Sequence, residues 1–226
     1  MSPKATRVSH RAGLGRPLRT VHQAWPLWWW LLWIGILVVI LGAVSVNPNL
    51  GAGTKVAGAS APVLATLVAG WLLSDKRLVV CEGGLLIGGF FPFRLPFAIR
   101  WQEIEPRGVT SVSDIGRLAS VTGRSQGSTL FLLPQSRAGI LLDGPLAPRA
   151  RLRGDGSIGA FDTAPDTVRG GKLWAFAHRM PPEQLVHLLT ERLSAASVPH
   201  AASLPDAALP PRSIARGGRI NGLARD

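Results

Sequence analysis

The sequence has few of the residues on which disulfide frameworks and thiolate metal centres depend. Among its 226 residues there is one cysteine and no tyrosine. A single cysteine excludes an intramolecular disulfide and a cluster of cysteine metal ligands. Cys81 lies in an alternating apolar run, where a cysteine usually belongs to the core. The sequence places no histidine or acid to activate this thiol, so we expect no catalysis from it.

Acidic residues are also scarce. The chain has 13 Asp and Glu against 25 Lys and Arg, which gives a formal charge of +12 at pH 7. Such a balance invites a nucleic-acid partner. However, basic and aromatic residues do not interleave as they do in single-strand-binding proteins, so we expect no nucleic-acid partner. Residues 1–24 carry five basic residues and no acid, and they stand directly before a hydrophobic segment.

Charge is absent altogether from residues 27–46, which read LWWWLLWIGILVVILGAVSV. About 20 residues of helix span the roughly 30 Å hydrocarbon core of a bilayer. Tryptophans crowd the first end of the segment, as at a membrane interface. The alternative is a secretory signal peptide, but this run is longer than the usual hydrophobic region of such peptides. The pattern predicts a membrane-spanning helix.

A second, weaker segment covers residues 56–73. Alanines at 61, 65 and 69 form a small-residue stripe that would suit close packing against Gly35 and Gly42 of the first segment. The intervening stretch 47–55, NPNLGAGTK, is typical of a turn, so the two segments are predicted to form a hairpin. Basic residues flank the outer ends, which predicts that both termini are cytoplasmic and that the protein resides in the cell membrane.

After Asp75 the apolar pattern changes to short, alternating runs separated by glycine turns, which is typical of a β-sandwich or barrel. The strand candidates are 78–82, 85–87, 98–101, 109–112, 117–121, 129–133, 139–142, 157–161 and 173–178. Pro182 begins a run with leucines at helical spacing, which predicts one closing helix. The predicted division is therefore a basic cytoplasmic tail (1–24), a transmembrane hairpin (25–75), a β domain (76–197) and a disordered basic tail (198–226).

The order of these motifs resembles a known family. EGGLLI at 82–87, IRWQEI at 99–104 and PPEQL at 181–185 follow the two hydrophobic helices. This order is similar to that of bacterial pleckstrin-homology-like (PH-like) membrane proteins over residues 25–196. The resemblance implies an antiparallel β-barrel or sandwich with a C-terminal capping helix, anchored by the hairpin. It implies no activity, no catalytic residue and no cofactor.

Few residues suggest chemistry. The five histidines are scattered without metal-ligand spacing. Glu103 and Glu105 lie two apart, and we interpret them as exposed strand acids rather than an acid–base pair. Possible lipid or partner contacts are Arg94, in an aromatic and proline-rich stretch, and the alternating Arg149, Arg151 and Arg153, which would share one face of a strand.

The sequence therefore predicts a membrane protein that presents its PH-like domain as an interaction or assembly module, without catalytic, metal or cofactor sites. The expected partners are the lipid bilayer and a membrane or cytoplasmic protein, and self-association through the transmembrane helices stays open. The alternative is a membrane-surface enzyme or lipid-headgroup-binding protein whose site is assembled from distant strands.

Overall fold

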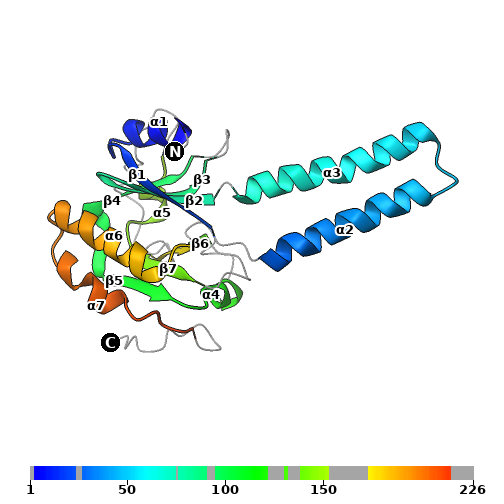
Figure 1. The fold of residues 1–226 in the computed structure, drawn as a ribbon. Coiled ribbons are helices and arrows are strands. Elements are labelled where there is room, and N and C mark those ends of the chain that lie inside the picture. The colour runs from blue at the N-terminus through cyan, green and yellow to red at the C-terminus, as the bar shows by residue number, and fades with distance from the viewer. Residues whose placement is uncertain are drawn as a thin grey trace. The chain divides into compact units, whose positions relative to one another are not determined.

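The computed structural model describes residues 3–23, 27–74, 76–90, 95–121, 130–131, 138–152 and 173–214. The chain divides into two compact units. One comprises Met1–Ala24 together with Lys76–Asp226, and we call it the β unit. The other comprises Trp25–Asp75, and we call it the hairpin unit. The hairpin unit is therefore an insertion in the chain of the β unit, as the ribbon in Figure 1 shows.

The hairpin unit consists of the antiparallel helices α2 (Leu27–Val46) and α3 (Ala52–Ser74) (Figure 1). The first helix has the predicted bounds, and the second begins four residues earlier than predicted. Lys55 Nζ donates a hydrogen bond to the Ser45 carbonyl oxygen at 3.0 Å. The charge of Lys55 thus lies against the C-terminal end of α2, where a cation is favourable.

The packing between the two helices differs from the predicted small-residue contact. A Cβ atom placed on Gly35 or Gly42 would meet no atom of the described residues within 4 Å, so these glycines do not form a groove for α3. A Cβ on Gly58 would instead lie 3.5 Å from the side chain of Val44. Ala61 and Ala65 of the predicted stripe are exposed, so α3 does not contact α2 through that stripe.

Among the described residues, no helix combines the length and the apolarity that crossing a membrane requires. On this finding the predicted transmembrane hairpin is wrong, and so is the predicted cell-membrane location with both termini cytoplasmic.

The β unit begins with residues that were predicted to be a tail. Helix α1 (Pro3–Arg11) is followed by strand β1 (Pro17–His22), which pairs antiparallel with β2 (Lys76–Cys81). Strands β3 (Gly84–Gly89) and β4 (Phe97–Arg100) complete a four-stranded antiparallel sheet in the order β1-β2-β3-β4. The prediction of a tail over 1–24 is wrong because β1 supplies the strand that β2 needs on its outer edge.

Both faces of this first sheet are buried, which explains the role of α1. Along β2, Leu78 and Val80 point into the main core, whereas Val79 and Cys81 point to the opposite face. Helix α1 covers that second face with Ala5 and other apolar residues. The exposed side of α1 carries its basic residues, so a short and mostly polar helix can still bury one apolar stripe.

The second sheet has the order β5-β7-β8-β6. Its strands are β5 (Glu105–Val112), β6 (Leu130–Phe131), β7 (Gly139–Asp143) and β8 (Leu173–Ala177). The pair β6–β8 is parallel, and the others are antiparallel. The described strands thus form two separate sheets and not a closed barrel, so the barrel in the prediction of an antiparallel barrel or sandwich is wrong.

One closing helix lies on the main core, as predicted. Helix α6 (Pro182–Ala195) buries four apolar side chains against both sheets, and the 3₁₀ turn η1 (Trp101–Glu103) adds the indole of Trp101. The main core contains Val21, Leu78, Val80, Leu85, Ile87, Ile99, Trp101, Ile140, Leu142, Trp174, Phe176, Leu185, Val186, Leu189 and Leu193, among others.

Other elements depart from the predictions. The run 117–121 is helix α4 (Gly116–Val121) rather than a strand, because Ile115 and Leu118 are buried at helical spacing. The predicted tail from 198 contains the 3₁₀ turn η3 (Ala201–Ser203) and α7 (Leu204–Ala208). The β domain therefore does not end at 197. The predicted strand 157–161 and residues 215–226 lie outside the described residues.

Candidate functional site

The arginines that were predicted to make partner contacts do not form the expected row. Arg149 lies in the last turn of the short helix α5 (Ala147–Ala150), and Arg151 forms an isolated bridge with Phe97 on β4. Both side chains are exposed. A strand that presents them on one face is not formed, because the helical turn rotates Arg149 away from strand alternation. Arg94 and Arg153 lie outside the described residues.

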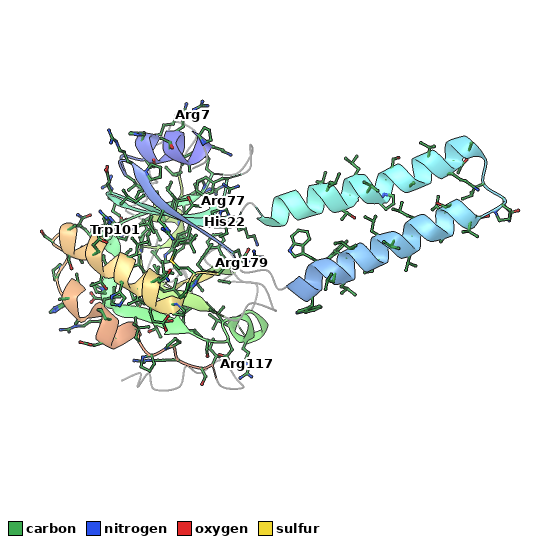
Figure 2. The ribbon with its side chains drawn as sticks, viewed as in Figure 1. Arg7, His22, Arg77, Trp101, Arg117 and Arg179 are labelled. Atoms are coloured by element: carbon green, nitrogen blue, oxygen red, sulfur yellow. The ribbon has the colours of Figure 1, made fainter. Side chains whose placement is uncertain are left out.

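A different basic cluster comes from three distant segments. His22 ends β1 and is paired in register with Arg77 of β2, so their side chains lie on the same face of the first sheet. Arg179 follows β8 of the second sheet. Figure 2 shows the three labelled side chains near one another, at the ends of their strands. We call His22, Arg77 and Arg179 the basic cluster.

The two arginines act electrostatically on the histidine. Partial burial lowers the pKa of His22 below its ordinary value, and the positive charges of Arg77 and Arg179 lower it further. A lowered pKa keeps the imidazole neutral at neutral pH, so His22 then offers one N–H donor and one acceptor. The positive charge of the cluster at neutral pH therefore comes from its two arginines and not from His22.

The backbone around His22 is held in place by Gln23. Its amide nitrogen Nε2 donates to the carbonyl oxygen of Phe131 on β6 at 2.9 Å, and its backbone N–H donates to the Lys76 carbonyl at 3.4 Å. These bonds tie the end of β1 to both sheets. They fix the position of His22 relative to the turn that carries Arg179.

A second histidine lies next to the cluster but points inward. His178 is 2% exposed, and its Nδ1 bonds the Met180 carbonyl oxygen at 2.7 Å, so Nδ1 carries the proton and Nε2 is an acceptor. That Nε2, like Oε1 of Gln23, is buried and has no hydrogen-bond partner among the described residues. Burial lowers the pKa of His178, although the bond to Met180 opposes the shift.

The groups that could suggest catalysis are engaged or inert. Burial raises the pKa of the Cys81 thiol to about 12, helped by the charge of Glu82, so thiolate is rare at neutral pH. Glu103 accepts the Arg100 backbone N–H at 2.8 Å within η1, whereas Glu105 starts β5, so the two carboxylates do not share a strand. Among the described residues, no group of three His, Cys, Asp or Glu could hold a metal ion.

The sequence pattern did not reveal the basic cluster. Its members are separated by 54 and 101 intervening residues along the chain. Strand pairing sets His22 beside Arg77, and Arg179 comes from the end of β8 in the second sheet. Neither a family model nor a curated protein nor a solved structure matches the chain.

Proposed function

We propose that the β unit is a binding module that recognises an anionic partner through the basic cluster. The observation that carries the proposal is the convergence of Arg77, Arg179 and His22 from three segments of the chain. Guanidinium groups bind phosphate and carboxylate groups with two parallel hydrogen bonds, and a nearby neutral imidazole adds a further donor. The cluster therefore suits a partner that presents phosphate or carboxylate oxygens.

We further propose that the β unit is a PH-like domain. The order of its elements supports this proposal, because a four-stranded antiparallel sheet precedes a second sheet and the helix α6. The chain departs from the expected order at both ends, because a helix and a strand precede the hairpin and because η3 and α7 follow the closing helix. The β unit binds rather than catalyses, which agrees with the raised pKa of the Cys81 thiol.

Titration of His22 by NMR tests the proposal on the full chain. Pyrophosphate is the probe, and the imidazole Cε1–H signal of His22 reports its protonation. A bound anion offsets the two arginine charges, so saturating pyrophosphate should raise the pKa of His22. Because the contact is ionic, binding should weaken as salt increases.

Matched arginine variants make the test specific. The double variant Arg77→Gln/Arg179→Gln should bind pyrophosphate at least tenfold more weakly. Arg100→Gln should bind normally, because Arg100 is exposed and pairs with Gly84, at the opposite end of β3 from Gly88, the partner of Arg77. An unchanged pKa of His22 on addition of pyrophosphate, or equal binding by both variants, would contradict the proposal.

A further inference from the structure

The chain beyond α7 runs along the outer edge of β5. Arg212 forms a parallel bridge with Val112, donates its backbone N–H to the Ser111 carbonyl at 2.9 Å, and accepts the Ser113 N–H at 3.0 Å. We call residues 211–214 the strap. In Figure 1 the strap leaves α7 beneath β5 and passes toward α4. It adds one isolated bridge to the outer edge of β5.

Ile214 is the anchor of the strap. Its side chain is 1% exposed and completes a small apolar cluster of its own, separate from the main core. The other members of this cluster are Val112, Ile115, Leu118, Leu141, Ala175 and Ala177. All of these belong to β5, α4 with the turn before it, β7 and β8, so the pocket is built without the strap.

The backbone of Ile214 is held as firmly as its side chain. Asp114 Oδ1 accepts the Ile214 N–H at 2.8 Å, and Arg117 donates to the Ile214 carbonyl oxygen at 3.0 Å. Asp114 and Arg117 also form an ion pair at 2.9 Å, which fixes the two groups relative to each other. Ile214 is thus bound through its amide N–H, its carbonyl oxygen and its side chain.

These contacts are independent of most of the strap sequence. They use main-chain groups and one aliphatic side chain, which is how domains that extend a sheet edge bind extended peptides. Any extended segment with an isoleucine, leucine or valine at the anchor position could make the same contacts. The strap has the advantage of being attached, because a tethered segment competes at a high effective concentration.

We propose that the edge of β5 and the Ile214 pocket form a peptide-binding groove, which the strap occupies in cis and which an extended partner segment with an aliphatic anchor binds when the strap leaves. This site is distinct from the basic cluster and does not depend on it. Its occupant is a peptide rather than a small anion. The strap acts as an intramolecular competitor that keeps the groove closed.

A labelled copy of the strap tests the groove on the full chain. The probe is a fluorescein-labelled peptide of residues 208–216, ALPPRSIAR, followed by fluorescence anisotropy. In the variant Ile214→Asp the tethered anchor carries a charge that disfavours the apolar pocket. The peptide should bind this variant at least tenfold more tightly than the parent chain. A peptide with aspartate at the anchor position should bind neither.

Two further substitutions check that the peptide occupies the groove. In the Ile214→Asp background, Arg117→Gln should weaken peptide binding, because it removes the donor to the anchor carbonyl. Arg107→Gln is the matched control, since Arg107 is exposed on β5, near the other end of the strand.

Three results would overturn the proposal. One is no saturable binding of the peptide to Ile214→Asp, and another is equal binding to the parent and the variant. The third is loss of the β unit's fold in Ile214→Asp by circular dichroism, because Ile214 would then be an indispensable core residue and not an exchangeable anchor.

Discussion

Replacing Trp101 with alanine should cost the β unit a large part of its stability. The indole is fully buried in the main core, and its Nε1–H donates to the Glu82 carbonyl oxygen at 2.8 Å. Removing such a side chain leaves a cavity, which costs about 3–5 kcal/mol. The lost hydrogen bond adds about 1 kcal/mol. Folded domains are typically stable by about 5–15 kcal/mol, so Trp101→Ala should remove about a third or more of the free energy of unfolding of the β unit.

A second substitution separates the two contributions. Trp101→Phe keeps most of the apolar volume but leaves the Glu82 carbonyl without its donor, so it should cost about 1–3 kcal/mol. Hydrogen exchange of the backbone amides in β2 and β3 measures these free energies for the β unit alone. Tryptophan fluorescence is unsuitable because the chain has eight tryptophans. If Trp101→Ala changes the exchange free energy by less than about 1 kcal/mol, Trp101 does not support the core as argued.

Three further predictions follow from the same packing. Burial lowers the pKa of His178 in the folded state below 6.5, so the unfolded chain takes up this proton at a higher pH than the folded chain does. The free energy of unfolding should therefore be full above about pH 6.5 and fall as the pH decreases. The urea midpoints at pH 5 and pH 8 should differ less in His178→Gln than in the parent chain. Leu189→Ala should cost about 2–5 kcal/mol in thermal or urea unfolding, whereas His187→Ala, exposed on the same helix, should change stability by less than about 0.5 kcal/mol. Replacing residues 24–75 with a short Asn-Gly turn should leave the NMR signals of β2, β3 and β7 in place; their loss would show that the register of β1 and β2 needs the hairpin unit.

The sequence predicted those helices and strands in which apolar residues form a long uninterrupted run or repeat at helical or strand spacing. The apolar run 27–46 is a helix with those bounds, and the leucines after Pro182 form α6. The alternating runs at 139–142 and 173–178 lie in β7 and β8. Each of these segments is long enough, or alternates strictly enough, to specify its own secondary structure. Their packing partners could not be read from the same patterns.

The elements that were missed depend on contacts with distant residues. Strand β1 buries only its first residue and Val21, so its sequence shows no alternation. Helix α1 is mostly polar and buries three residues. A signal was nevertheless present in β2, where Leu78 to Cys81 are apolar on both faces of the strand. A strand of this kind needs a cover on each face, and residues 5–14 supply part of the second cover.

The hairpin unit is inserted in the chain between His22 and Arg77 without separating these two members of the basic cluster. Neighbouring strands of an antiparallel pair end close together, since paired strands lie about 5 Å apart. The end of β1 at His22 and the start of β2 at Lys76 are such a pair of ends. An antiparallel pair of helices also begins and ends at the same end, so it can be inserted between those two points without separating the strands. The register that sets His22 beside Arg77 is therefore fixed by the sheet itself. Val21 lies opposite Leu78, and the backbone N–H of Gln23 donates to the Lys76 carbonyl. The 52 residues between Gln23 and Lys76 along the chain do not set this register.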